Sequence, residues 1–144
     1  MGHSNGIKDG VTDRLFNGAL HWGVASSEHR ILTGDHVSDY SLQDGEYHIF
    51  RVVWTPNEIA MFLDDNKEPY MRVDISDRSS EDGVGYYFHK DNFLLLNMAV
   101  GGNFPGIHDA EGITALPQGS AEMLVDYVRI YQKDDAKSTL TLLK

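Results

Sequence analysis

The apolar residues of this chain fall into short segments separated by glycine, proline, asparagine and aspartate. The longest segment, residues 93–100, is apolar at every position except Asn97, and such a run is typical of a strand buried on both faces. An unpaired buried amide costs about 1–3 kcal/mol, so we expect Asn97 to face a polar groove. The Gly101-Gly102 pair then predicts a backbone corner, and the turn that follows carries Phe104.

Further segments carry the period-two alternation, or the β-branched and aromatic residues, that are typical of strands. They are residues 19–25, 47–54, 59–64, 70–73 and 123–131. Residues 55–58 predict a turn that joins 47–54 and 59–64 in a hairpin, and residues 70–73 extend it as a meander. The residues between them, including 26–45 and 76–85, are polar and predict loops. Helical periodicity is not sustained anywhere in the sequence, and no segment is repeated. The pattern therefore predicts an all-β fold, an antiparallel β-sandwich.

The length of 144 residues fits one domain. We expect a loop-rich N-terminal segment over residues 1–18, a β-domain over residues 19–132 and a tail over residues 133–144, in which residues 140–143 are a candidate edge strand. Residues 1–6 are polar and do not have the character of a secretory signal. We therefore expect either that a signal was removed or that the chain starts inside a longer protein.

Charge and composition exclude several classes of function. The chain has 22 acidic against 12 basic residues and a net charge of −10, and its basic residues do not cluster, which argues against a nucleic-acid partner. It contains no cysteine, so disulfides, thiolate metal sites and a cysteine nucleophile are excluded. No apolar run reaches the length of a membrane span.

Several side chains are candidates for binding. His21 shares its strand face with alanine and glycine, and the sequence leaves open whether it lines a cleft or is a hydrogen-bonded residue of a packed sheet. Asp126 shares a face with aliphatic residues, so we expect a salt bridge or a hard cation beside it. For Trp22 and Trp54 we favour core packing, and Phe104 is the better candidate for stacking on a sugar.

The acidic residues provide no catalytic pair on a predicted strand. A glycosidase needs two carboxylates that flank the scissile bond, but most acids of this chain fall in predicted turns, where a solvated side chain is the expected state. The seven histidines likewise form no metal-ligand pair on a regular element, and a zinc site needs three or four convergent ligands.

Five motifs, taken in order, resemble a known family. They are Ala-Leu-His-Trp at 19–22, Tyr-His-x-Phe-x-Val-x-Trp-Thr-Pro at 47–56, Ile-x-Met-Phe-Leu-Asp-Asp at 59–65, Leu-Leu-Asn-Met-Ala-Val-Gly-Gly-Asn-Phe-Pro-Gly at 95–106, and Met-x-Val-Asp-Tyr-Val-Arg-Ile-Tyr-Gln at 123–132. Together they resemble the C-terminal half of family 16 glycoside hydrolases, in the laminarinase or endo-β-1,3-glucanase branch.

The resemblance implies a concanavalin-like jelly roll whose concave sheet holds a β-glucan, and retaining hydrolysis by a secreted or periplasmic enzyme that requires no cofactor. It implies that His21, Asn97 and Phe104 border the cleft. It also implies that Asp126 matches a residue that binds a structural calcium in many members, with the other ligands located upstream.

The family's catalytic strand carries a Glu-x-Asp-x-x-Glu motif, which does not occur in residues 1–144. We therefore expect an incomplete jelly roll that does not hydrolyse glucan by the family mechanism. The alternative is a non-catalytic glucan-binding or structural remnant, and an unrelated lectin is a third reading. Half a jelly roll leaves sheet edges unpaired, so we expect a homodimer or a strand-exchanged assembly.

Overall fold

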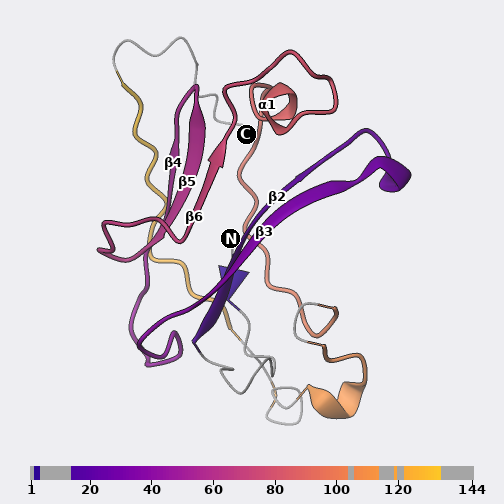
Figure 1. The fold of residues 1–144 in the computed structure, drawn as a ribbon. Coiled ribbons are helices and arrows are strands. Elements are labelled where there is room, and N and C mark those ends of the chain that lie inside the picture. The colour runs from indigo at the N-terminus through magenta and orange to yellow at the C-terminus, as the bar shows by residue number, and fades with distance from the viewer. Residues whose placement is uncertain (1, 4–13, 104–105, 114–118, 120–121, 134–144) are drawn as a thin grey trace.

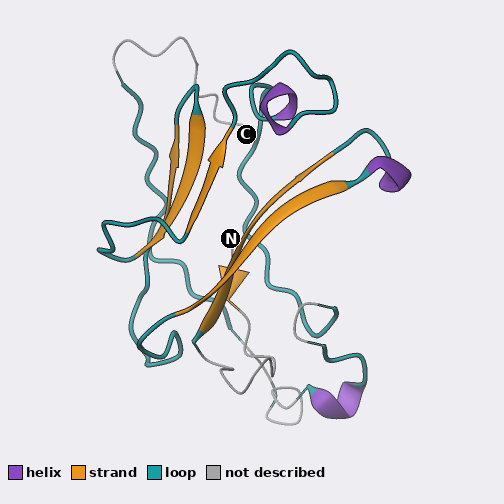
Figure 2. Cartoon of the chain, in the orientation of Figure 1, coloured by secondary structure: helices purple, strands orange, loops and turns teal. Residues whose placement is uncertain are grey.

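A computed structural model describes residues 2–3, 14–103, 106–113, 119 and 122–133. They form two antiparallel sheets of three strands each (Figures 1 and 2). The first sheet has the order β1-β2-β3, and the second has the order β4-β5-β6. The strand bounds are β1 Gly2–His3, β2 Leu15–Trp22, β3 Arg30–Val37, β4 Phe50–Trp54, β5 Glu58–Leu63 and β6 Met71–Asp74.

Three short helical segments lie outside the sheets: the 3₁₀ turns η1 Ser26–Glu28 and η2 Ala110–Gly112, and the helix α1 Val84–Tyr87. The sequence pattern predicts none of them, because one turn of helix is too short to establish a periodicity of 3.6 residues. No helix in the described ranges is long and apolar enough to cross a membrane.

The core lies between β2 and the second sheet. Leu20 of β2 is buried in one cluster with apolar residues of β5, β6 and the residue after β6: Ile59, Met61, Met71, Val73 and Ile75. Near the other end of β2, the Phe16 ring packs edge-on against Tyr70, with centroids 4.7 Å apart. The predicted class, an all-β antiparallel sandwich, is therefore confirmed, and this arrangement holds β2 in place through its buried face.

The predicted hairpin is confirmed in the second sheet. β4 and β5 pair antiparallel from Phe50↔Leu63 to Trp54↔Ile59. The turn between them is closed by Thr55, whose hydroxyl accepts the backbone N–H groups of Asn57 and Glu58 at 3.2 and 3.1 Å. The Gly101-Gly102 corner is confirmed as well, because both residues have positive φ and Gly102 bridges to Ile107.

The first sheet departs from the prediction at both ends of β2. The strand begins at Leu15, inside the segment predicted as loop, and it ends at Trp22, so that Val24 is 76% exposed rather than in the core. The loop predicted over residues 26–45 contains β3, which pairs with β2 along all eight positions of both strands. β3 was not predicted because it is an edge strand with no buried position, and burial is what creates a readable alternation.

The two strands predicted over residues 93–100 and 123–131 are wrong for this structure. Neither segment has regular secondary structure, and every residue of both is exposed, with Leu95 at 73% and Tyr131 at 84%. An isolated strand makes no backbone hydrogen bonds of its own and gains stability only through a partner. No strand in the described ranges pairs with either segment, so their apolar pattern is not matched by burial.

Candidate functional site

The predicted binding residue His21 lies near the tip of the β2–β3 hairpin. Its side chain is exposed, and its Nδ1 lies 2.8 Å from Nε2 of His29, just across the hairpin tip. The two rings stack with an interplanar angle of 12°. Partial burial and the neighbouring His29 both lower the pKa of His21, which favours a neutral ring at pH 7. His21 is therefore a hydrogen-bonded residue of a sheet strand, as one of the two interpretations expects, but its side chain is exposed rather than packed.

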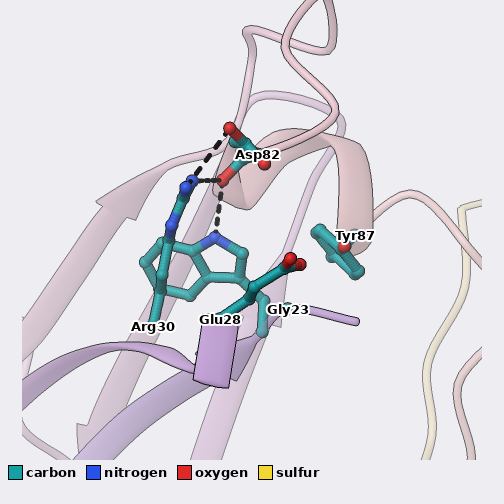
Figure 3. A pocket seen from close by; sticks show the side chains of 6 residues that line it. Gly23, Glu28, Arg30, Asp82 and Tyr87 are labelled. Carbon is teal, nitrogen blue, oxygen red and sulfur yellow. Dashed lines mark hydrogen bonds and ion pairs between the residues drawn. The ribbon is translucent and has the colours of Figure 1, made fainter. Parts of the chain in front are cut away.

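A hydrogen-bonded cluster lies beside His21 at the same end of the hairpin. The Trp22 Nε1 donates to the Asp82 carbonyl oxygen at 2.8 Å, and Arg30 donates to the same oxygen at 2.5 Å. The Arg30 guanidinium also pairs with the Asp82 carboxylate at 3.2 Å (Figure 3). Trp22 and Arg30 face each other in the strand register, so both anchor the loop before α1 to the end of the first sheet.

The small pocket around this cluster is lined by Gly23, Glu28 and Tyr87 in addition to the three bonded residues (Figure 3). Its cavity volume of about 10 Å³ leaves room for one water molecule, not for a sugar ring. The Asp82 carboxylate is already paired with the Arg30 guanidinium. This pocket therefore offers no free pair of carboxylates of the kind that glycoside hydrolysis requires. We interpret it as a structural anchor for the hairpin that presents His21.

The two other described site residues, Asn97 and Asp126, are not gathered around His21. Asn97 and Asp126 are both exposed, each in a segment without regular structure, and Phe104 lies outside the described residues. No hydrogen bond, ion pair or ring contact joins His21, Asn97 and Asp126 in the described part of the chain. The prediction that Asn97 lies on a sheet strand, facing a groove, is therefore wrong for this structure, because its segment has no sheet to extend.

Asp126 lies on an exposed segment rather than beside a salt-bridge partner among the described residues. Its side chain is exposed, and no salt bridge to it is present among the described residues. Within the same residues, no three histidine or acidic side chains converge as a metal site would require. A partner was expected because burying an unpaired charge is costly, but the Asp126 carboxylate is exposed to solvent and does not incur that cost.

The tryptophans depart in part from the expected core packing. Trp54 is 46% exposed, and its ring lies against Phe88 with centroids 5.9 Å apart. Trp22 is half-buried, with its indole nitrogen bonded to Asp82. Sequence reasoning missed His29, which contacts His21, and Arg30 and Asp82, which lie beside Trp22. The β2–β3 pairing and the path of the loop before α1 bring these residues together.

Comparison with known proteins finds no matching family model. Among curated proteins, the chain is 32% identical over 121 residues to the clotting factor G alpha subunit of Tachypleus tridentatus, which covers 84% of this chain and 16% of that protein. It is 35% identical over 96 residues to a glucan endo-1,3-beta-glucosidase of Cryptopygus antarcticus, and this match covers 62% of this chain and 33% of that protein. It is 31% identical over 87 residues to a beta-glucanase of Rhodothermus marinus, and this match covers 60% of this chain and 29% of that protein.

The chain is a homologue of β-glucanases. The resemblance to family 16 glycoside hydrolases that its motifs predict is thereby confirmed. The chain spans 16% to 33% of the length of these three relatives. Among solved structures, a Bacteroides ovatus GH16 in complex with G4G4G3G product is 26% identical, with a TM-score of 0.44 over 47% of this chain and 28% of that one.

Proposed function

We propose that this chain is part of a β-glucan-directed glycoside hydrolase of the retaining endo-β-1,3-glucanase type. The observation that carries the proposal is the similarity to curated glucanases, which runs over 60% to 81% of the chain in three of them. The order of the five motifs along the sequence supports the same assignment. In this proposal, the chain contributes one wall of the glucan cleft.

The proposed cleft residues have chemistry suited to a sugar. His21 presents an exposed imidazole at the end of β2, and Asn97 presents an exposed amide that both donates and accepts hydrogen bonds. Phe104 would supply an apolar face for the sugar ring. An ordered cleft requires that residues 93–100 gain a sheet partner, and we propose that they do so when the glucan-binding form assembles.

The proposal assigns no catalytic residue to this chain. Because residues 1–144 contain no Glu-x-Asp-x-x-Glu, they do not supply that motif's nucleophile and acid/base pair. We therefore expect the 144-residue protein to release no reducing sugar from laminarin above the blank rate, while a β-1,3-glucanase control releases it readily. Clear turnover by the purified chain would contradict catalytic incompleteness.

Glucan binding tests whether this chain retains a glucan site. Both an incomplete glucanase that keeps its cleft wall and a non-catalytic glucan-binding remnant should bind glucan, whereas a chain without such a site should not. Calorimetric titration with laminarioligosaccharides should give saturable heat, and Asn97→Ala should weaken binding by about tenfold, since one lost hydrogen bond is worth about 1–1.5 kcal/mol. Asn66→Ala is the matched control, because this exposed asparagine lies in the β5–β6 turn. No heat with the wild-type chain would overturn the proposed glucan site.

The proposed family also motivates a structural calcium at Asp126. The exposed carboxylate offers one oxygen ligand group, whereas calcium takes six to eight oxygens. In the proposal, Asp126 contributes to a site whose other ligands come from outside the described residues.

We also propose that the chain associates through its exposed strands, with a second copy as the partner. β3 and β4 each pair on only one side within the described part of the chain, and both carry exposed apolar residues: Ile31, Leu32, Phe50, Val52 and Trp54. Light scattering should give a mass of at least twice 16.2 kDa. A monomeric mass with a cooperative melt would count against the assembly.

A further inference from the structure

A second cluster of titratable residues lies away from the proposed glucan site. It consists of Tyr40 and Asp44 in the loop before β4, His48 at the end of that loop, and Asp64 directly after β5; we call it the His48 clasp. The proposed function uses none of these four residues. They connect the loop before β4 to the residue after β5, next to the pairing of β4 with β5.

His48 contacts a carboxylate with each of its ring nitrogens. Nδ1 lies 3.0 Å from Asp64 Oδ2, and Nε2 lies 3.2 Å from Asp44 Oδ1. Ionised carboxylates only accept hydrogen bonds, so both contacts are hydrogen bonds only when both nitrogens carry a proton. The His48 side chain is 11% exposed, which limits the ability of water to replace either partner. The geometry therefore corresponds to an imidazolium ion.

Asp64 is the fixed end of the clasp. Its Oδ1 accepts the Ile49 backbone N–H at 2.7 Å, its own N–H donates to the Ile49 carbonyl at 2.8 Å, and its Oδ2 also accepts the Tyr40 hydroxyl at 2.5 Å. Its φ of 51° is in the left-handed region, which aspartate tolerates better than most residues. The Tyr40 ring stacks on His48 with centroids 5.6 Å apart, so it covers the ion pair on one face.

The charges around His48 support this protonation state. Partial burial alone would lower the pKa of His48, but the hydrogen bonds and charges of Asp64 and Asp44 outweigh burial and raise that pKa above its ordinary value. The backbone N–H of Glu46 is the main group that lowers the pKa of Asp44, and His48 adds to the shift. Burial alone would raise the pKa of Asp64, but hydrogen bonds from Tyr40, the Ile49 N–H and His48 outweigh it and lower that pKa. Burial, the Asp64 hydrogen bond and the nearby Asp39 and Asp44 raise the pKa of Tyr40 to about 12, so it remains a donor.

We propose that His48 is a proton-controlled clasp that holds the loop of residues 38–49 against the end of β5. As the imidazolium, it bridges Asp44 and Asp64. When it loses a proton, the neutral ring can donate to only one of them, and its remaining lone pair faces the other carboxylate. Asp44 lies in the same loop as His48, whereas Asp64 follows β5, so a neutral ring cannot bond Asp44 and hold the loop to Asp64 at the same time. Loss of the proton therefore weakens the attachment of the loop to Asp64, including the adjoining hydrogen bond from the Ile49 N–H.

The direction of the pH effect follows from the two kinds of group. The His48 contribution is fully present below the unfolded-state value of about 6.5 and is lost as pH rises through the raised folded-state pKa. The contributions of Asp44 and Asp64 are present above the unfolded-state value of about 3.8 and are lost as pH falls through their lowered pKa values. The clasp is therefore closed in mildly acidic solution and opens as pH rises through the raised pKa of His48.

Nuclear magnetic resonance of the full chain tests the proposal. The His48 ring should titrate above pH 6.5, and the Ile49 amide protection factor, corrected for intrinsic exchange, should fall by about tenfold as this ring deprotonates. In His48→Gln the protection should be low and independent of pH across this range. His108→Gln, at an exposed histidine in another loop, should behave like the wild type.

Asp44→Asn provides a second variant on the exposed loop, where it leaves the fold unchanged. It keeps an acceptor oxygen but removes the charge, so the His48 titration should move to lower pH than in the wild type. A His48 titration at or below pH 6.5 would overturn the clasp, and so would an unshifted titration in Asp44→Asn. Ile49 protection in His48→Gln that is as high as in the wild type, or that still falls with rising pH as in the wild type, would overturn it as well.

Discussion

Leu20→Ala is expected to lower the free energy of unfolding by about 2–5 kcal/mol. Leu20 is 4% exposed and is the one β2 residue in the cluster that joins the two sheets, where it meets residues of β5 and β6. Truncation removes apolar surface from the core and leaves a cavity in a densely packed region. Since a small domain is stable by only about 5–15 kcal/mol, this loss is a large share of the total.

Urea denaturation followed by circular dichroism measures this change, and Leu32→Ala is its matched control. Leu32 is the strand partner of Leu20 in the β2–β3 register, but it is 43% exposed because β3 is at the sheet edge. We expect its truncation to cost about 1 kcal/mol or less. Equal losses in the two variants would mean that Leu20 does not connect the sheets in solution.

Gly85→Ala is expected to destabilise the protein by about 3 kcal/mol, even though alanine has the higher helix propensity. A Cβ atom at Gly85 would overlap the Asp77 carbonyl oxygen and lie 2.5 Å from the Ile75 carbonyl oxygen. Both are backbone atoms, so they cannot move aside as a flexible side chain would. The substitution therefore forces α1 away from the segment that carries Ile75, which is fully buried.

Thermal and urea unfolding measure this loss, with Gly34→Ala as the control. A Cβ at Gly34 meets no atom closer than 3.8 Å, so we expect a change within about 0.5 kcal/mol. An unfolding midpoint for Gly85→Ala equal to that of the wild type would show that α1 is not packed on residues 75–77.

The sequence was informative where a strand is half-buried and its neighbour in sequence is its partner. The β4–β5 hairpin was predicted because its strands carry β-branched and aromatic residues and the Thr55-Pro56 turn separates them. β3 was not predicted, since all of its positions are at least partly exposed and exposure removes the alternation. The alternation of apolar and polar residues identifies strands that have one buried face, and β3 has no buried residue.

The candidate site illustrates the same limit. The motif that contains Asn97 is visible in the sequence, and the similarity of the chain to glucanases is confirmed by the relatives. Residues 93–100, which contain Asn97, do not form the predicted strand, because no described strand pairs with them. A strand forms only when a neighbouring strand offers the complementary backbone hydrogen bonds. His48 was read only as part of a strand, because its carboxylate partners are four and sixteen residues away and meet it through the hairpin.

By itself, the sequence determined the fold class, the β4–β5–β6 meander, the glycine corner at Gly101-Gly102 and the kinship with β-glucanases. These follow from local periodicity, backbone preference and motif order, which need no knowledge of distant contacts. Only the tertiary structure decided which apolar segments are buried, which histidines are paired and how the Asp82 loop is anchored. Each of these depends on residues far apart in the chain, whose approach is set by sheet pairing and packing.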